Sequence, residues 1–566
     1  MLGLHILDWI ILAIYFSTVA YLGIYLGAKK TKSLGDFFIA GGTWKKLPAF
    51  LFNFSSSLAG AEAVVVSAAA YRSGLSGIWF WWSQLFATPM YYLFSVVYKR
   101  ARVFNMAEFF ELRFGAGVAN LYSVLGLLIC VNFIGIFITG GGKVLAAITN
   151  LPIDSAVLIC CTVVALYVAS GGAMSSLLTD LFQGILCLIV LSFGLLPFLW
   201  NAAGGLDALL DLPGSTWSLQ SKEIPWSYVI ALLFSGTVGS VVTPNILTWI
   251  AIGRDEKAGT QCAWAHVWKR LVTILFALYG ILFAIYHPGL ADPELAWGTL
   301  MKSLLPVGVL GLLVASFAAA LMSSVDTFAT ATSGLVVDYL YRKRLFPNRP
   351  SSFYINHARL WGFIAVFLGY ITTRFLENIV QYIELGWSFF SFIAVPLYFG
   401  LVWRRTNRQA LWAGVMTGAV LFTLLKLVLN SPFEYTVFIP TLSCALVTWI
   451  VSLKTVPEDA ALLDRFYAIL NTPVGQDARL QETGIKLPAM NNASPEKTTS
   501  IEYEDTNKIH QLYEFYAQDK IFGPTSNIEL RRESELQWFY RGVLSVTIWC
   551  VTLIVGVLAF SYYMQS

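Results

Sequence analysis

Charged residues are scarce in this sequence. Asp, Glu, Lys and Arg together make up 12% of the 566 residues, whereas 57% are hydrophobic and 15% are aromatic. A soluble domain usually carries about 25% charged residues, and a chain of this length would need them to cover its surface. The composition therefore excludes soluble globular, disordered and collagen-like proteins and indicates a polytopic membrane protein. The net charge of +4 is too small to indicate a nucleic-acid partner.

Motifs of metal, redox and nucleotide chemistry are also missing. The five histidines are scattered without an HExxH pattern, and no GxxxxGK[ST] phosphate loop occurs. The seven cysteines form no CxxC pair and lie in, beside or just after apolar runs, so we expect them to be small buried residues. They are Cys130, Cys160, Cys161, Cys187, Cys262, Cys444 and Cys550.

Long apolar runs dominate what is present. Fourteen segments are close to the roughly 20 residues that an α-helix needs to cross a bilayer, and strand-like alternation is nearly absent. The first run is too long for a secretory signal and lacks its basic start, so we expect a retained helix. We predict an all-α membrane protein of about 14 transmembrane helices, over residues 6–28, 47–72, 77–98, 120–143, 152–170, 174–200, 226–252, 267–287, 305–340, 356–375, 378–403, 409–430, 434–453 and 542–563.

Basic residues alternate between successive loops. They gather in the first, third, seventh, ninth and eleventh loops, whereas the second loop has only Arg72 and loop 201–225 is acidic. By the positive-inside rule the odd-numbered loops are cytoplasmic, and fourteen crossings then place both termini outside the cytoplasm. The polar segment 454–541 is predicted to be cytoplasmic and is too short for a kinase or ATPase domain. Within it, residues 458–470 have helical apolar spacing.

Two spans are predicted to be broken helices. Three serines, Gly60 and Glu62 interrupt the apolar segment 52–71, and Gly236, Gly239 and Pro244 fall inside 235–249. The freed carbonyls of a broken membrane helix must be satisfied by protein, water or ions. These are the second and seventh spans, as two five-helix repeats with a midplane binding site would place them. The alternative is ordinary kinks in packed helices.

The ninth span carries the strongest signal of a binding site. Ser323, Ser324, Asp326 and Thr327 lie inside a long apolar helix, at spacings that bring them onto adjoining edges. Such oxygen-rich, nitrogen-free clusters suit hard cations. An Asp at membrane depth costs at least about 2.5–3.5 kcal/mol, so it is functional or paired. The alternative is hydroxyls that bond back to their own helix, with Asp326 paired to a neighbour. A second carboxylate, Asp180, lies just inside span six, where a capping role is the alternative.

Four stretches together resemble the solute:sodium symporter family, which includes sodium–sugar, sodium–proline and sodium–sialate transporters. They are FFIAGGTWKKLPAFLFNFSSSLAGAE (37–62), MAEFFELRF (106–114), YVASGGAMSSLLTDLFQ (167–183) and AAALMSSVDT (318–327). The resemblance implies the LeuT-type fold, a five-plus-five inverted repeat flanked by extra helices. With the broken second and seventh helices, this divides the chain into 1–46 (first helix and basic loop), 47–403 (transport core), 404–453 (accessory helices), 454–541 (polar cytoplasmic segment) and 542–566 (last helix).

The resemblance also implies sodium sites. The family's main site falls on five oxygen atoms here, the carbonyls of Ser56, Ala59 and Ala320 and the hydroxyls of Ser323 and Ser324. Some members bind a second sodium, and the matching positions are Asp180, Asp326 and Thr327. Asp326 stands where the family has Ser or Thr, so this second cation site departs from the usual pattern.

The positions that match the family's solute site are less polar than in sugar transporters. They are Ala63, Trp81, Gly236 and Ile383, and a gating Tyr of sugar transporters falls on Gly239, so we infer no sugar. The aromatic run Trp79–Trp82 and Gln84 are expected to face the same cavity, with a lipid-facing belt as the alternative. Glu62 and Gln84 complete the list of cavity candidates.

The sequence thus predicts a sodium-coupled symporter of a small organic solute in the cell membrane. Its partners would be the solute, Na⁺ as coupling ion and the lipid bilayer, with no nucleic acid and no organic cofactor. No covalent chemistry is implied, so we expect no enzyme. Two rival functions remain, a transporter-like membrane receptor or sensor, and an uncoupled uniporter or channel. The intact Ser323 and Ser324 pair argues against loss of coupling.

Overall fold

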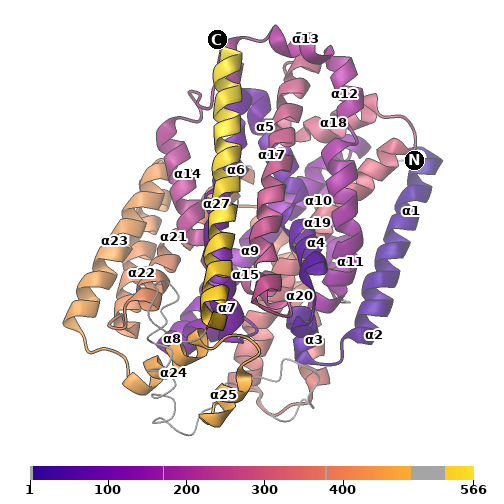
Figure 1. The fold of residues 1–566 in the computed structure, drawn as a ribbon. Coiled ribbons are helices and arrows are strands. Elements are labelled where there is room, and N and C mark those ends of the chain that lie inside the picture. The colour runs from indigo at the N-terminus through magenta and orange to yellow at the C-terminus, as the bar shows by residue number, and fades with distance from the viewer. Residues whose placement is uncertain (1–3, 170, 376–378, 486–529, 566) are drawn as a thin grey trace.

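Helices form the regular structure of the chain in this computed structural model (Figure 1). The structure describes residues 4–169, 171–375, 379–485 and 530–565. Within those ranges the one β-type pairing is an isolated bridge between Trp44 and Gly253. The predicted all-α class is confirmed. Residues 486–529 of the predicted polar segment lie outside the described residues.

Each of the fourteen predicted runs falls on helical residues. By length and composition, nine of the described helices can cross a membrane, and a bent pair that covers the second and third runs makes a tenth. The other three runs fall on α10 (Ile153–Val168), on α14 (Trp226–Gly239) with the short helices after it, and on α20 (Ser351–Thr372). The nine are Ile6–Lys30, Ala116–Thr149, Ala173–Ala203, Glu256–Tyr286, Val309–Leu345, Ile379–Val402, Arg408–Val428, Phe433–Lys454 and Gln537–Gln565.

The second span is broken, as predicted. α4 (Lys46–Ser57) ends and α5 (Gly60–Ser73) begins with two residues between them, and the two parts are bent by 51°. Leu58 and Ala59 leave the helical conformation, with ψ angles of 80° and 138°. This interruption, Leu58–Ala59 with the helix ends beside it, is called the hinge below.

The seventh span is broken as well. α14 leads through a short 3-10 turn, Ser240–Val242, to α15 (Ile246–Ala251). Thr243 between them is extended, with ψ 136°, which agrees with its place before Pro244. Both predicted discontinuities are therefore present in the structure.

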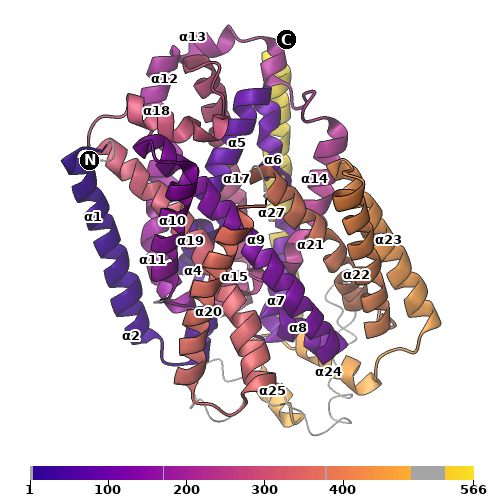
Figure 2. The ribbon, with the colours of Figure 1, turned by 180° about the vertical axis from the view of Figure 1, so that it is seen from behind.

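Unbroken helices hold the two broken ones in the middle of the bundle (Figures 1 and 2). α19 (Val309–Ser333) packs on α4 and α5 from one side, and α17 (Gln261–Tyr286) packs on them from another. α21 (Ile379–Val402) packs on α14. α9 (Ala116–Thr149) and α11 (Ala173–Leu186) pack on α19. α27 (Leu530–Gln565) packs on α7 (Thr88–Ala101) and α17.

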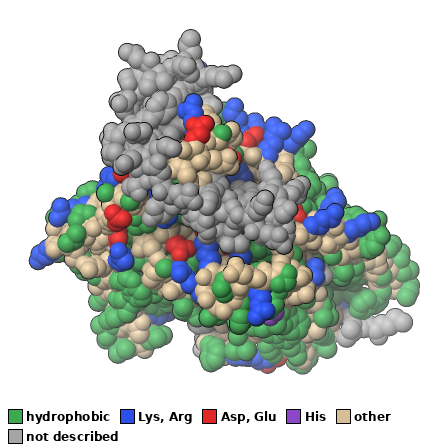
Figure 3. Space-filling view, turned by 90° about the horizontal axis from the view of Figure 1, so that it is seen from below, with side chains coloured by type: hydrophobic (Ala, Val, Ile, Leu, Met, Phe, Trp, Pro, Cys, Tyr) green, Lys and Arg blue, Asp and Glu red, His purple; other side chains and the backbone are tan. Residues whose placement is uncertain are grey.

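The two ends of the molecule differ in charge and in what covers them. Both termini lie at one end, and α24 (Ala460–Asn471) and α25 (Asp477–Glu482) lie at the other (Figure 1). Lys and Arg side chains gather on this second end (Figure 3). The buried Arg102 ties α25 to the bundle through the Asp477 carboxylate, 2.7 Å away. The helical spacing predicted for 458–470 is confirmed by α24.

Candidate functional site

The hinge lies against the serine pair of α19. A Cβ added at Gly60 would lie 3.3 Å from a ring carbon of Phe317 and 3.6 Å from the Cβ of Ala320, so glycine permits this close approach. The Ser323 hydroxyl donates to the Ser55 carbonyl at 3.1 Å and also lies 3.4 Å from the Ala320 carbonyl. α19 and the end of α4 are thus joined at the residues that the sequence singled out.

The five residues of the predicted main sodium site are all buried. The Ser324 hydroxyl has no hydrogen-bond partner among the described residues. The Ser56 hydroxyl bonds back to its own helix, at 2.8 Å from the Phe52 carbonyl. The Ala59 carbonyl accepts from the Glu62 amide at 2.9 Å, and a carbonyl oxygen has a second lone pair to offer. The set offers oxygen atoms alone, which suits Na⁺ and other hard cations.

Two carboxylates lie buried next to this set. Asp180 on α11 accepts from the Ser55 hydroxyl at 3.3 Å, and its other oxygen has no hydrogen-bond partner in the described structure. Asp326 accepts from the Tyr167 hydroxyl at 3.0 Å and lies 3.3 Å from the Thr327 hydroxyl. Asp180 is therefore linked to the main set through Ser55, and Asp326 is linked to it through Thr327, whose hydroxyl donates to the Ser323 carbonyl at 3.0 Å.

Neither carboxylate forms an ion pair with a Lys, Arg or His in the described part of the chain. Asp180 is 0% and Asp326 is 2% exposed. A buried carboxylate without a counter-charge is costly in its ionised form. A cation beside them, or a proton on them, removes that cost, and both possibilities remain compatible with the geometry.

Glu62, predicted as a cavity residue, is instead engaged by side chains of α17. Its carboxylate is 2.9 Å from the Lys269 ammonium and 3.4 Å from the Arg270 guanidinium, and it accepts from the Thr273 hydroxyl at 2.5 Å. Sequence reasoning missed Lys269 and Arg270. Two adjacent basic residues at the start of the apolar run 267–287 were the signal that could have found them.

The other cavity candidates are buried, and two of them, Gln84 and Gly236, are in close contact. Trp81 and Gln84 are buried, and both polar atoms of the Gln84 amide lack a hydrogen-bond partner among the described residues. Gly236 lies against this amide, since an added Cβ would come within 2.3 Å of its nitrogen. Ile383 on α21 is buried, and Ala63 is held through its carbonyl by the Trp297 indole at 3.0 Å.

The aromatic run Trp79–Trp82 does not face lipid. All four side chains are buried, which excludes the alternative of an interfacial belt. The Trp79 indole donates to the Leu219 carbonyl at 2.8 Å, and the Trp82 indole donates to the Arg270 carbonyl at 3.3 Å. Phe80 lines a cavity, whereas Trp81 and Gln84 are not among the residues that line it.

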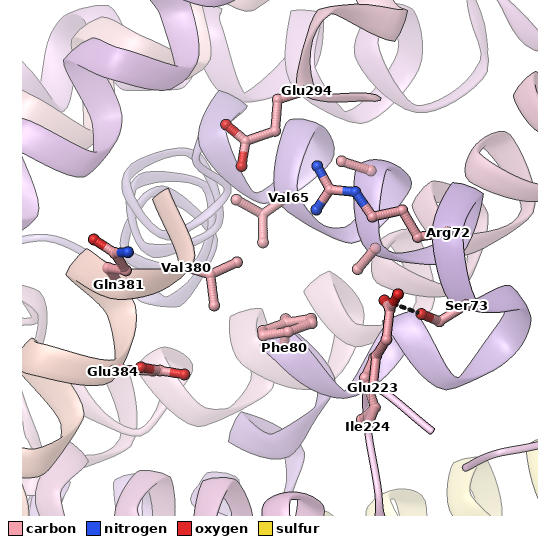
Figure 4. A pocket seen from close by; sticks show the side chains of 12 residues that line it. Val65, Arg72, Ser73, Phe80, Glu223, Ile224, Glu294, Val380, Gln381 and Glu384 are labelled. Atoms are coloured by element: carbon pink, nitrogen blue, oxygen red, sulfur yellow. Dashed lines mark hydrogen bonds between the residues drawn. The ribbon is translucent and has the colours of Figure 1, made fainter. Parts of the chain in front are cut away.

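This cavity has a volume of about 280 Å³ (Figure 4). Figure 4 shows Phe80 between Glu384 and Glu223, with Arg72 and Glu294 beyond it. Its wall comes from α5, from α6 (Trp79–Trp82), from the loop before α14, from the turn before α18 (Ala296–Leu304) and from the start of α21. The lining residues are Val65, Ala68, Ala69, Arg72, Ser73, Phe80, Glu223, Ile224, Glu294, Val380, Gln381 and Glu384.

Hydrogen bonds close the bundle at the basic end. The backbone of Trp44, just before α4, bonds to Ile252 and Arg254, just after α15, at 3.2 and 2.8 Å. The Asn53 amide of α4 donates to the Trp249 carbonyl of α15 at 3.0 Å. The two broken helices are therefore fastened together on the side opposite the cavity.

Comparisons with known proteins agree on one family. The model of the Sodium:solute symporter family matches residues 37–418. A sodium/glucose cotransporter of Vibrio parahaemolyticus is 23% identical over 506 residues, which cover 81% of this chain and 92% of the relative. Sodium/proline symporter 2 of Staphylococcus saprophyticus is 23% identical over 444 residues, which cover 73% of this chain and 84% of the relative.

Solved structures agree on the fold. A Na⁺-coupled sialic acid symporter in its substrate-bound outward-open state matches with a TM-score of 0.69 at 17% identity, covering 80% of this chain and 98% of its own. Mhp1, a nucleobase-cation-symport-1 family transporter, matches with a TM-score of 0.51 at 14% identity, covering 76% and 97%. The predicted LeuT-type fold is confirmed.

Proposed function

The chain belongs to the sodium:solute symporter family, and we propose that it carries a small organic solute across the membrane, coupled to Na⁺, by alternating access. The observation that carries the proposal is the contact between the hinge and the α19 serine pair. There, one buried hydroxyl bonds a hinge carbonyl and the next has no hydrogen-bond partner in the described residues.

The main sodium site would consist of the carbonyls of Ser56, Ala59 and Ala320 and the hydroxyls of Ser323 and Ser324. Sodium at this position would join the hinge to α19. Its inward movement would supply about 2.3 kcal/mol per charge for each 100 mV of membrane potential, in addition to the concentration gradient. This energy would drive solute uptake against a gradient.

A second cation would bind between Asp180, Asp326 and Thr327. The support is the burial of two carboxylates that no basic side chain neutralises within the described residues. The hydrogen bond between Asp180 and Ser55 would connect this cation to the same hinge as the first. A proton carried by Asp326 is the competing assignment, and the Asn variant discussed below separates the two.

The solute would enter from the end that carries the termini. The 280 Å³ cavity is close to the lower limit of small-molecule sites, about 300 Å³, and therefore fits a metabolite-sized solute. Ala63, Trp81, Gln84, Gly236 and Ile383 would line the deeper solute site. All five are buried, and they come from the two broken helices, from the segment after α5 and from α21. Among them, the Gln84 amide offers a free donor and a free acceptor. Glu62 would hold the hinge rather than the solute.

We assign the protein to the cell membrane, with both termini extracytoplasmic and residues 454–541 cytoplasmic. The clustering of Lys and Arg at the end opposite the termini supports this orientation (Figure 3). The cavity would then open towards the outside, and the hydrogen bonds between α4 and α15 would close the cytoplasmic side.

Reconstitution in lipid vesicles tests the proposed function. Radioactive sodium should bind in the absence of solute, and a screen of sugars, amino acids and carboxylates should find a solute whose uptake requires an inward sodium gradient. A receptor or sensor would bind its ligand without flux. A uniporter or channel would move its solute equally well in potassium, and either result would contradict the proposal.

A further inference from the structure

The hinge is held from a second side by a buried ammonium group. Lys269 on α17 donates to the carbonyl of Ser57, the last residue of α4. The same ammonium lies 2.9 Å from the carboxylate of Glu62, in the first turn of α5. One side chain therefore touches both halves of the broken helix.

The charges suit the helix ends that they touch. The carbonyl end of a helix carries partial negative charge and its amide end carries partial positive charge. Lys269 is placed at the carbonyl end of α4, and Glu62 at the amide end of α5. The two side chains are 4% and 0% exposed, so water screens these interactions little.

Lys269 and the serine pair act on carbonyls two residues apart at the end of α4. The Ser323 hydroxyl of α19 bonds the Ser55 carbonyl, whereas Lys269 of α17 bonds the Ser57 carbonyl. Of the predicted sodium ligands, Ser56 precedes Ser57 directly and Ala59 follows it by two residues. The Ala59 amide donates to the Ser57 carbonyl at 3.1 Å, so an ammonium that fixes this carbonyl also holds the backbone at Ala59.

We propose that Lys269 is a positioning residue of the sodium site: its ammonium is a built-in cation that holds the Ser57 carbonyl and so fixes the hinge segment that carries the sodium ligands Ser56 and Ala59. This rests on the proposed function, since it assumes that sodium binds on the α19 side. The Ser57 carbonyl also accepts from the Ala59 amide at 3.1 Å, and Lys269 adds a permanent charged donor to it.

Because Arg270 also pairs with Glu62, the hinge contact of Lys269 can be tested apart from its neutralisation of the Glu62 charge. Its guanidinium lies 3.4 Å from Glu62 and donates to the Trp81 carbonyl at 2.7 Å. If Lys269 is replaced by Met, Arg270 still neutralises Glu62, and the net charge of the cluster falls from +1 to zero. Lys269→Met therefore removes the hinge contact while Glu62 retains a partner.

The test compares sodium affinity with fold stability in purified, lipid-reconstituted protein. We expect Lys269→Met to weaken sodium binding about tenfold or more, because a hydrogen bond from a charged donor is lost at the hinge. Radioactive sodium binding gives the affinity, and the melting temperature without sodium gives the stability. A merely structural ion pair would lower the melting temperature and leave the sodium affinity of the folded protein unchanged.

A control is the ion pair between buried Glu108, on α8 (Met106–Phe114), and half-buried Lys343, which has the same 2.9 Å separation and does not contact the hinge. The double variant Glu108→Gln with Lys343→Met should keep its sodium affinity. If Lys269→Met does not fold, Lys269→Met with Glu62→Gln removes the pair as a whole and is measured instead, with the same loss expected.

The outcomes separate the two proposals. Wild-type sodium affinity in the folded Lys269 variant, with affinity lost in Ser323→Ala with Ser324→Ala, would overturn the role of Lys269 and leave the proposed function standing. Unchanged affinity in both variants would reject the sodium site itself. Equal loss in the Glu108–Lys343 control would show that any buried pair matters, and this would also overturn the inference.

Discussion

The serine pair of α19 gives the sharpest test of the main sodium site. Ser323→Ala combined with Ser324→Ala removes two of the five proposed oxygen ligands. The cost to the fold should be small. The Ser323 hydroxyl forms its inter-helix bond at 3.1 Å, worth about 1 kcal/mol, and the Ser324 hydroxyl has no partner to lose among the described residues.

The cost to sodium binding should be much larger. Each lost ligand to a buried charge costs about 1–3 kcal/mol, so two ligands cost at least about 2 kcal/mol. Since 1.4 kcal/mol is a factor of ten, the apparent sodium affinity should fall at least about tenfold. The variant should therefore reach the membrane and melt near the wild-type temperature, but it should need a much higher sodium concentration for half-maximal uptake.

Sodium-dependent uptake and radioactive sodium binding in vesicles measure this effect. Ser333→Ala is a suitable control, because Ser333 is a buried serine about three turns further along α19 that bonds the Ala329 and Ala358 carbonyls at 2.9 and 2.7 Å. It should keep its sodium dependence. A folded double variant with wild-type sodium dependence would refute the assignment.

Three further predictions follow from the same structure. Asp326→Asn keeps the size of the side chain but removes its charge, so it should lower the number of charges coupled to each solute or flatten the sodium Hill slope. Loss of only the pH dependence of transport would favour proton transfer. An unchanged stoichiometry with an unchanged pH profile would leave Asp326 a structural residue. Ala69→Trp should obstruct the cavity and reduce solute uptake while sodium binding persists, and undiminished uptake would place the solute path elsewhere. In a cysteine-free background, Gln565→Cys should react with an impermeant reagent in intact cells and Glu482→Cys should not, whereas the reverse labelling pattern would invert the proposed orientation.

Sequence reasoning located the helices and their breaks because those features depend on local composition. Apolar runs long enough to cross a bilayer must be helical, and each of them is. Gly60, Gly239 and Pro244 marked the interruptions because such residues weaken helices. The nearness of Asp180 to the hinge, in contrast, came from family resemblance, since no local pattern relates α11 to α4.

The pairing of Glu62 with Lys269 could not be read from the sequence. Glu62 interrupts the apolar segment 52–71 and was expected in the solute cavity, and nothing in that segment points to α17. Its partners on α17 lie about two hundred residues away; the Glu62–Arg270 contact, for example, spans 208 positions. The cavity was missed for the same reason, since its lining combines five segments that meet through tertiary packing.

The two contacts at the hinge differ in permanence, and this difference suggests how binding could be coupled to movement. Lys269 is covalently part of α17 and holds the ends of α4 and α5 whether or not sodium is present. Sodium would connect the same hinge to α19, and this connection is lost when the ion leaves. The Ser323–Ser55 hydrogen bond then remains as a weaker link, worth about 1 kcal/mol. Loss of sodium would therefore loosen the broken helix from α19 while it stays attached to α17. A bound ion can shift the populations of two arrangements of a helix only by binding one arrangement more tightly than the other. Here the ligands come from both the hinge and α19, so sodium would bind more tightly when the broken helix lies against α19.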